Sequence, residues 1–286
     1  MSVSALLSRT VTIGGVRTRM LERPGDDALT LLLIHGWADS ADTWKPLIAA
    51  LDDLPARIVA FDLPSFGAAG DLQPGPQLPQ FVATVAAALQ QFAGRGRLLP
   101  VGQSLGGRAL LMALHQADAA SRAIPGCIVI GPAPLELPAW QKMLVRNGSL
   151  APSASRLGEP LDAAQQRAEF LKSFKRTCLA EPDRVDASVY DDYLRHYTAE
   201  RIGRHMESLR LIGGELQQPL SLDRVQMPVE IIWGEADRMA PVGGADRYCQ
   251  ALRDARLTRL PGCGHHAHLE RIDDVATIVR RMAQPV

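Results

Sequence analysis

Short, almost uniformly apolar runs recur along this 286-residue chain, and stretches with helical spacing separate them. The runs are Leu31–Ile34, Arg57–Phe61, Leu98–Val101, Cys127–Ile130 and Val229–Trp233. A strand that is apolar on both faces is typical of a parallel sheet with helices on either side. The alternation of strand and helix therefore predicts a doubly wound α/β fold with a mostly parallel sheet.

Three local patterns refine this prediction. The spacing of Phe81, Val85, Leu89 and Phe92 predicts a helix between the second and third runs. Near the N-terminus, TVTIGGVRTRML predicts a β-hairpin that turns at Gly14-Gly15. Pro100 lies inside the third run, where it would remove a hydrogen bond of the sheet, so we expect the strand to run out at this residue.

The alternation stops between about residues 135 and 222. Three groups of apolar residues with helical spacing follow instead: Ala168, Leu171, Phe174 and Cys178; Val189, Tyr190, Tyr193, Leu194 and Tyr197; and Ile202, Met206 and Leu209. We expect residues 135–222 to form an all-helical cap, inserted into a core domain of residues 1–134 and 223–286. A cap over the C-terminal edge of the sheet would cover the edge where α/β proteins bind ligands.

The composition excludes several classes of partner. Lys and Arg (31) balance Asp and Glu (31), so no overall field favours nucleic acid. No run approaches the roughly 18 apolar residues of a membrane span. The four cysteines lack CxxC spacing and the N-terminus lacks a basic, apolar leader, so we expect a cytoplasmic protein with free thiols. A small substrate that is uncharged or mildly charged is the expected partner.

The pentapeptide Gly102-Gln103-Ser104-Leu105-Gly106 matches G-x-S-x-G, with a predicted strand before it and a helical pattern after it. Such a sharp strand-to-helix turn strains the backbone at the serine and needs small neighbours, which Gly102 and Gly106 provide. Ser104 is therefore the candidate nucleophile. The alternative is an ordinary tight turn.

A serine hydroxyl needs a base, and the base needs an acid that orients it. The apolar run that ends at Trp233 is followed by Gly234 and then Asp237, which would lie at the same edge of the sheet as Ser104. Asp237 is the candidate acid. Glu235 is a near rival, and Glu136 a more distant one.

Three histidines follow the predicted strand Ala255–Leu260, in the sequence LPGCGHHAHLE. The glycines before His265 free the backbone, so this side chain is best placed to reach Ser104 and is the candidate base. We expect His266 and His268 to be surface or supporting groups. The other histidines are dispersed and no HExxH occurs, so we expect neither a metal site nor a cofactor.

The run Leu31–Ile34 leads into His35-Gly36-Trp37. The backbone N–H groups of Trp37 and of Leu105, the residue after the nucleophile, are the candidate oxyanion hole. The Trp37 indole would narrow the acyl side of the site, unless it only packs in the core. His35 is expected to brace this loop by hydrogen bonding.

Together these stretches resemble the α/β-hydrolase superfamily, in that family's order and approximate spacing. The matching motifs are HGW at 35–37, DLPSFG at 62–67, GQSLGG at 102–107, WGEADRMAP at 233–241 and GCGHHAHLE at 262–270. The resemblance implies that Ser104, Asp237 and His265 are nucleophile, acid and base, and it selects His265 over its neighbours. A serine, where halide-displacing and epoxide-opening members typically carry aspartate, disfavours those reactions.

The residues and the resemblance together predict an esterase-like serine hydrolase that cleaves carboxylic esters of small to medium apolar acyl groups. Lactones, thioesters and carbon–carbon bonds are alternative substrates for the same triad, and a non-catalytic ligand-binding role is a further alternative. The branch that cleaves carbon–carbon bonds is not preferred, since it usually has a Gly-rich run after HG and Asn before the serine. The candidate substrate-binding residues are Trp37, Gln103, Trp140, Phe170 and Phe174.

Overall fold

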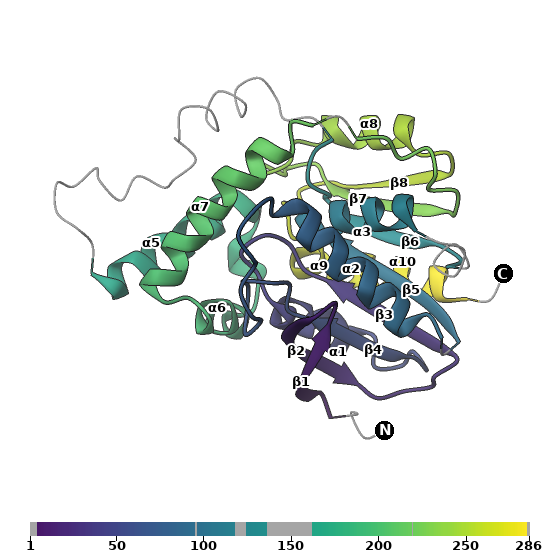
Figure 1. Ribbon diagram of the computed structural model, residues 1–286, viewed down its shortest axis with the longest axis horizontal. Helices are drawn as coiled ribbons and strands as arrows, with labels where there is room; N and C mark the ends of the chain where they lie inside the picture. The colour runs from purple at the N-terminus through teal and green to yellow at the C-terminus, as the bar shows by residue number, and fades with distance from the viewer. Residues whose placement is uncertain (1–4, 95, 118–123, 136–161, 219, 285–286) are drawn as a thin grey trace.

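The computed structural model describes residues 5–94, 96–117, 124–135, 162–218 and 220–284. Its centre is an eight-stranded sheet with the strand order β1-β2-β4-β3-β5-β6-β7-β8 (Figure 1). The strands are β1 (Leu7–Ile13), β2 (Val16–Arg23), β3 (Leu29–Ile34), β4 (Arg57–Phe61), β5 (Arg97–Gln103), β6 (Cys127–Ile130), β7 (Val229–Gly234) and β8 (Ala255–Leu260). All pairs from β4 to β8 are parallel, which confirms the predicted mostly parallel sheet.

The first two strands form the predicted antiparallel hairpin, and β2 continues antiparallel to β4. The turn residues Gly14 and Gly15 have φ values of +57° and +82°. Two successive left-handed residues match the right-handed twist of a tight hairpin, and glycine adopts them without strain. The Gly-Gly pair therefore fixes the register of this edge.

Helices cover both faces of the sheet, as a doubly wound fold requires. On one face lie α2 (Leu78–Phe92), α3 (Ser104–Gln116) and α8 (Gly243–Ala251), and on the other α1 (Lys45–Ala50), α9 (Ala267–Glu270) and α10 (Ile272–Ala283). Strand β3 shows the division: Leu32 and Ile34 belong to the first apolar core, and Leu31 and Leu33 to the second. All six of its residues are buried, which explains why the sequence shows no polar alternation there.

Pro100 does not mark the end of a strand, so that expectation was wrong. It lies in the middle of β5 and pairs in register with Leu32 of β3. On its other side the pairing with β6 begins only at Val101, opposite Ile128. Because β6 is short, no ladder bond to that strand is needed at position 100, and a central strand tolerates the proline.

Between β6 and β7, the described residues form three successive helices. They are α5 (Ala163–Cys178), α6 (Ala187–Arg195) and α7 (Ala199–Glu215), with the short 3-10 helix η3 (Pro182–Arg184) between the first two. They confirm the three helical patterns, and within the described part of 135–222 no residue belongs to a strand. Domain boundaries at 134/135 and 222/223 remain our proposal. We call residues 162–218 the cap helices.

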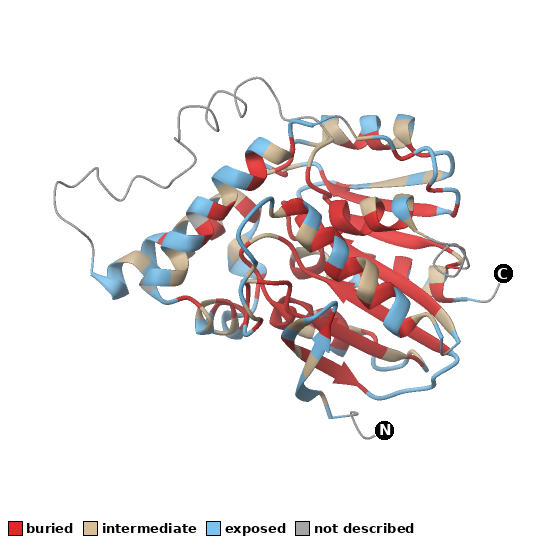
Figure 2. Cartoon of the chain, in the orientation of Figure 1, coloured by how far each residue is buried: buried red, intermediate tan, exposed pale blue. Residues whose placement is uncertain are grey.

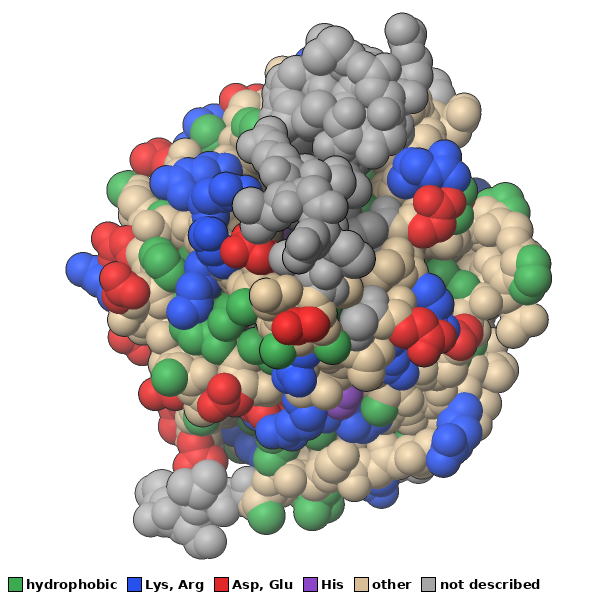
Figure 3. Space-filling model, turned by 90° about the vertical axis from the view of Figure 1, so that its left-hand side faces the viewer, with side chains coloured by type: hydrophobic (Ala, Val, Ile, Leu, Met, Phe, Trp, Pro, Cys, Tyr) green, Lys and Arg blue, Asp and Glu red, His purple; other side chains and the backbone are tan. Residues whose placement is uncertain are grey.

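The cap helices lie beside the edge of the sheet where the parallel strands end (Figure 1). Polar contacts join them to the segments that follow those strands. The contacts are Lys45 to Asp192, Asp42 to His196, Ser65 to His205, and Glu215 to the backbone N–H groups of Gln77 and Leu78. Figure 3 looks onto this side, where acidic and basic side chains are interspersed. The helices thus stand over the edge that α/β proteins use for ligands.

All four cysteines belong to the described part of the chain, and all are free thiols. Cys127, Cys178 and Cys263 are buried, and burial raises the pKa of each to about 12. The prediction of free thiols is confirmed. Among the helices of the described residues, none has the length and apolar character needed to cross a membrane.

Candidate active site

Ser104 stands at the junction of β5 and α3, with a φ of +50° that a residue with a side chain adopts only at a cost. The turn leaves no room for side chains beside it. A Cβ on Gly102 would lie 2.7 Å from the Cα of Gly107, and one on Gly106 would overlap the carbonyl oxygen of His35. The need for both glycines is confirmed, and the backbone has the strained strand-to-helix form that presents a serine at a sheet edge.

His265 and Asp237 form a buried pair, with 2.7 Å between Nδ1 and Oδ2. The other carboxylate oxygen of Asp237 accepts the backbone N–H groups of Met239 at 2.8 Å and Ala240 at 2.7 Å, so the acid is held in one orientation. A carboxylate only accepts hydrogen bonds, so Nδ1 of His265 carries the hydrogen. In the neutral ring the lone pair is therefore on Nε2, which is the state that a general base needs.

The loops after four neighbouring strands meet around this pair. Ser104 follows β5, Asp237 follows β7 and His265 follows β8. The loop after β6 lies between them: a Cβ on Gly131 would be 3.2 Å from Nδ1 of His265, and the N–H of Ala133 donates to the carbonyl oxygen of Ser104 at 2.9 Å. The three predicted residues thus share one edge of the sheet.

The three clustered histidines have separate partners. Of the three, His265 is the one bonded to Asp237, while Nε2 of His268 lies 3.0 Å from Oγ1 of Thr43 and Nε2 of His266 lies 3.6 Å from Oδ2 of Asp39. His266 and His268 are buried, so a surface position was wrong for both. Among the described residues, no three His, Cys, Asp or Glu side chains are grouped as metal ligands would be.

The backbone around His265 is held from three directions. Its N–H donates to the carbonyl oxygen of Cys178 at 2.7 Å, and its carbonyl oxygen accepts Nε2 of Gln103 at 3.3 Å. One oxygen of Glu270 accepts the N–H of Gly264 at 2.8 Å. Gln103 is almost fully buried, so its observed contact positions the base, and a contact with substrate stays a prediction.

The loop after β3 packs directly against Ser104. A Cβ on Gly36 would lie 3.0 Å from the Cβ of Ser104, and Trp37 is the next residue. Ala38 then adopts a φ of +51°, which turns the chain sharply. On the other side, the N–H of Leu105 is in the first turn of α3, where such groups have no acceptor within the helix. Both predicted oxyanion donors therefore belong to segments that flank Ser104.

His35 braces this loop, as predicted. Its Nε2 accepts the N–H of Leu63 at 2.8 Å, and its Nδ1 lies 2.8 Å from the carbonyl oxygen of Gly36. An acceptor Nε2 and a donor Nδ1 define a neutral ring. Burial lowers the pKa of His35, which keeps the ring in that state.

Asp62, which the sequence analysis did not single out, also fixes this loop, because its carboxylate accepts backbone hydrogen bonds. Its Oδ1 accepts the N–H of Ala41 at 2.7 Å, its Oδ2 accepts that of Ala68 at 2.8 Å, and Nε of Arg19 donates to Oδ2 at 2.9 Å. The sequence does contain a signal for this role, because Asp62 directly follows the apolar run 57–61. A residue in that position lies at the end of a buried strand, on the edge of the sheet where the site forms.

Of the acidic side chains that the sequence offered, Asp237 is the one bonded to Nδ1 of His265. Glu235 is exposed to solvent, and Glu136 lies outside the described residues. Glu270 was also passed over, although Oε1 accepts the N–H groups of Ala180 and Glu181 at 2.7 Å each. It thereby ties the loop of the base to the residues after α5. Its place five residues after His265 carried no recognisable signal.

Two of the predicted substrate-binding aromatics belong to one buried ring cluster of the cap helices. Phe170 stacks on Tyr193 with 5.9 Å between ring centroids, and Phe174 lies 4.3 Å from the same ring. Phe174 also meets His266 edge to face at 5.0 Å, so this cluster extends to the neighbour of the base. Contact of Phe170 and Phe174 with substrate stays a prediction, and Trp140 lies outside the described residues.

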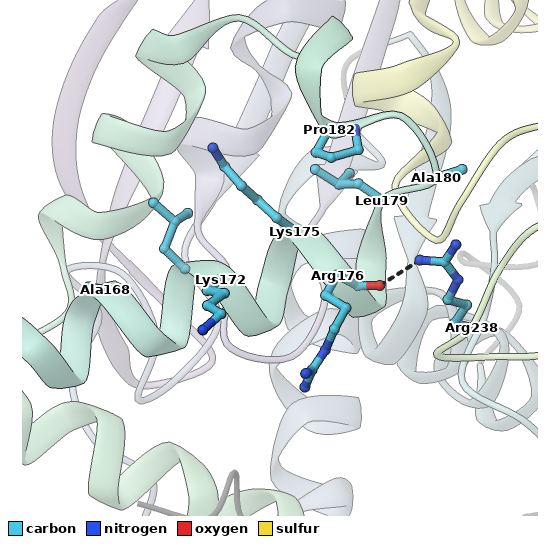
Figure 4. A pocket seen from close by; sticks show the side chains of 9 residues that line it. Ala168, Lys172, Lys175, Arg176, Leu179, Ala180, Pro182 and Arg238 are labelled. Carbon is cyan, nitrogen blue, oxygen red and sulfur yellow. Dashed lines mark hydrogen bonds between the residues drawn. The ribbon is translucent and has the colours of Figure 1, made fainter.

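A hollow of about 600 Å³ lies along the outer side of α5 (Figure 4). Its lining includes the apolar side chains of Leu171 and Leu179 and the basic side chains of Lys172, Arg176 and Arg238. Nη1 of Arg238 donates to the carbonyl oxygen of Arg176 at 2.8 Å. None of the predicted catalytic or oxyanion residues lines this hollow, so it is separate from the candidate site.

Comparison with known proteins matches this architecture. A family model described as "Alpha/beta hydrolase family" fits residues 31–278. Human monoacylglycerol lipase ABHD6 is 24% identical over 271 residues, which cover 90% of this chain and 75% of the lipase. A 2-hydroxy-6-oxo-6-(2'-aminophenyl)hexa-2,4-dienoic acid hydrolase from Metapseudomonas resinovorans is 23% identical over 284 residues, which cover 96% of this chain and 90% of that enzyme.

Solved structures match over nearly the whole chain. The crystal structure of a membrane phospholipase A, a bacterial virulence factor, superposes with a TM-score of 0.75 at 21% identity, and the match covers 98% of this chain and 86% of the phospholipase. At that identity the likeness establishes the fold alone.

Proposed function

Because the chain belongs to the α/β-hydrolase family, we propose that it hydrolyses carboxylic esters of small to medium apolar acyl groups through Ser104, His265 and Asp237. Ser104 attacks the ester carbonyl carbon while Nε2 of His265 takes the hydroxyl proton. Asp237, bonded to Nδ1, orients the ring and stabilises the imidazolium that forms. His265 then gives this proton to the departing alcohol, and an acyl-serine remains.

Water completes the cycle. His265, neutral again, takes a proton from water as the water oxygen attacks the acyl carbonyl, and it returns the proton to Oγ of Ser104 as the acid leaves. In both halves the carbonyl oxygen becomes negative, and the N–H groups of Trp37 and Leu105 are the proposed donors to it. Removing one such donor typically costs about 3 kcal/mol of transition-state stabilisation.

The observation that carries this proposal is the Nδ1–Oδ2 contact of 2.7 Å beside a strained serine. A purely structural Asp–His pair would not need a serine with φ of +50° at the same sheet edge. The strain at Ser104 costs stability, and such strain is common where a nucleophile must be presented. The arrangement therefore supports nucleophilic catalysis over a ligand-binding role alone.

Labelling with a fluorophosphonate tests the nucleophile. We expect wild type to form a covalent adduct on Ser104 that mass spectrometry locates, and Ser104→Ala to form none. Ser221→Ala is the matched control, because Ser221 is exposed and bonds only to Asp223 among the described contacts. An unlabelled wild type, or a label that persists in Ser104→Ala, would contradict the proposal.

A panel of p-nitrophenyl esters, lactones, acyl thioesters and a dienoic ring-fission product tests the substrate class. The last substrate is included because the Metapseudomonas relative is named for such a dienoic acid. Trp37-Ala38-Asp39 and Gln103 depart from the pattern of the carbon–carbon branch, so we expect esters to give the highest kcat/KM. At least tenfold higher kcat/KM on any other class would replace the ester assignment.

A further inference from the structure

Among the buried polar atoms that find no hydrogen-bond partner in the described residues, four belong to the loop after β3 and to the cap helices. They are Nε1 of Trp37, Oδ2 of Asp39, the hydroxyl of Tyr197 and Nδ1 of His205. Asp39, Tyr197 and His205 are each at least 95% buried. Buried polar groups are nearly always paired in folded proteins, so several unpaired groups together need an explanation.

The four side chains come from two neighbouring segments, the loop after β3 and the chain from the end of α6 into α7. The ring of His205 lies 5.2 Å from that of Tyr197 and 6.5 Å from that of Trp37, both edge to face. Burial, and next the negative charge of Asp39, raise the pKa of Tyr197 well above its usual value, while the side chain of Tyr193, whose ring centroid lies 5.0 Å away, acts in the opposite direction. We call Trp37, Asp39, Tyr197 and His205 the polar quartet.

The polar quartet is adjacent to the catalytic pair. Oδ2 of Asp39 lies 3.6 Å from Nε2 of His266, beyond hydrogen-bond distance, and the ring of His266 lies 5.4 Å from that of His265. Trp37 is also the proposed oxyanion donor through its backbone. A substrate held at Ser104 would therefore have one end near these groups.

The quartet offers both donors and acceptors. Nε2 of His205 faces the carbonyl oxygen of Ser65 at 3.2 Å and must be the protonated nitrogen, because a carbonyl only accepts. Burial lowers the pKa of His205 to about 4, so the ring is neutral and Nδ1 is an acceptor. Asp39 is a second acceptor, the Trp37 indole only donates, and the Tyr197 hydroxyl can do either.

We propose that the polar quartet binds a hydroxyl group of the substrate, so that esters carrying a hydroxyl on the acyl or the alcohol part are preferred. This rests on the proposed ester hydrolysis at Ser104. A hydroxyl can donate to Asp39 or His205 and accept from Trp37 or Tyr197. An ammonium group has no acceptor for Trp37, and a carboxylate has no donor for Asp39, so neither completes the set.

Matched substrate pairs test this subsite. One pair is p-nitrophenyl hexanoate and its ω-hydroxy derivative, and the other is propyl hexanoate and glyceryl hexanoate. In at least one pair we expect wild type to favour the hydroxylated ester by about tenfold or more in kcat/KM, because an ester without the hydroxyl leaves buried groups unpaired. The ω-ammonio hexanoate ester is the third member of the acyl series.

Two variants locate the effect. Tyr197→Phe removes only the hydroxyl, and Asp39→Asn keeps the Oδ1 acceptor for the N–H of Ser40 while it replaces the unpaired oxygen with a donor. We expect the hydroxyl preference to fall several-fold in both. The matched controls are Tyr190→Phe and Asp53→Asn. The hydroxyl of Tyr190 donates to the carbonyl oxygen of Pro182, and Asp53 forms an exposed pair with Arg280. Their preference should equal that of wild type.

The outcomes separate this inference from the proposed function. Fluorophosphonate labelling of Ser104 together with a ratio near one in both pairs overturns the subsite and leaves the hydrolase. A preference that survives both variants, or a stronger preference for the ammonium ester, also overturns it. Absence of labelling overturns the proposed function itself. A preference lost in Tyr197→Phe and Asp39→Asn but kept in the controls supports the polar quartet.

Discussion

In the sheet, β3 buries all six of its residues, whereas in the cap helices α5 buries three of its sixteen. Figure 2 shows the same difference, with buried strands in the core and exposed outer faces on the cap side. Apolar packing on both faces fixes the core, and a narrow ring cluster with scattered polar contacts holds the cap helices. Regions with few buried apolar contacts open at lower free energy, so the two parts should respond differently to mutation, pH and salt.

The largest expected effect is a loss of kcat when the acid of the candidate triad, in the core, is replaced. Asp237→Asn should keep the bonds to Met239 and Ala240 but no longer fix the tautomer of His265, so kcat should fall about ten-thousand-fold. Ester kinetics would measure this. Asp246→Asn, at an exposed pair with Arg259, is the control. A loss of less than tenfold in Asp237→Asn would mean that the pair is structural.

The next largest effect is on the free energy of unfolding, where the densely packed core should differ from the cap helices. Leu32→Ala removes a fully buried side chain from β3 and should lower the free energy of unfolding by about 3 kcal/mol, within the usual range for buried leucines. Leu171→Ala removes the same atoms from α5, where the side chain is only partly buried, and should cost about 1 kcal/mol or less. Urea denaturation measures both. Equal losses would show that the cap helices are as tightly packed as the core.

Acid should weaken the folded state through its buried neutral histidines. Burial lowers the pKa of His205 to about 4, so between pH 6.5 and 4 the unfolded chain binds a proton that the folded chain does not. Stability is then full above pH 6.5 and falls as the pH drops to 4, by up to about 3 kcal/mol for this group. Burial also lowers the pKa of His35, in the core, so the same sign applies there.

His205→Gln separates the contribution of the cap helices from that of the core. We expect this variant to lose less stability than wild type between pH 6.5 and 4, measured as the shift of the urea midpoint, and to keep the part that comes from His35. An identical pH dependence in the two proteins would show that His205 is not held neutral by burial.

Glu270 joins the two regions, since it accepts hydrogen bonds from Gly264 in the core and from Ala180 and Glu181 at the cap side. Glu270→Gln keeps one acceptor oxygen and loses the charge, so unfolding should become easier by about 2 kcal/mol, as for other charge-assisted bonds. Thermal denaturation measures this. Glu235→Gln, at an exposed residue, is the matched control, and an equal effect there would refute the linking role.

The smallest expected effect concerns the ion pair between Lys45 and Asp192, which connects the first residue of α1 with α6 and is partly exposed. Asp192→Asn should change the free energy of unfolding by only about 0.5 kcal/mol, and the difference should shrink as salt is added. Denaturation at low and high ionic strength measures it. A loss that is large and independent of salt would show that this pair, rather than apolar packing, holds α6.

The sequence predicted the sheet well because its strands are buried on both faces. Runs such as Arg57–Phe61 and Cys127–Ile130 match the observed strands in full, since burial on both faces leaves a signal that needs no long-range information. The prediction that the strand ends at Pro100 was wrong, because a proline interrupts a sheet only where the neighbouring strand needs its missing N–H group. The register of β6 against β5 is a property of the sheet and not of the segment around Pro100.

The candidate triad was also accessible from the sequence, since each member follows a recognisable strand and glycine. Ser104, Asp237 and His265 are placed by local turns, and the topology of a parallel sheet brings those turns to one edge. The supporting groups were not accessible. Glu270 and Asp62 act through backbone N–H groups of distant loops, and no local pattern announces such a bond.

The sequence by itself determined the strands that are apolar on both faces. These strands define the parallel sheet and the edge at which its loops meet. Only the tertiary structure decided which acidic side chains brace the loops, and that Oδ2 of Asp39, the hydroxyl of Tyr197 and Nδ1 of His205 find no hydrogen-bond partner among the described residues. The reason is physical. Apolar burial depends on periodicity along one segment, whereas the pairing of polar groups depends on directed contacts of a few ångströms between segments far apart in the chain.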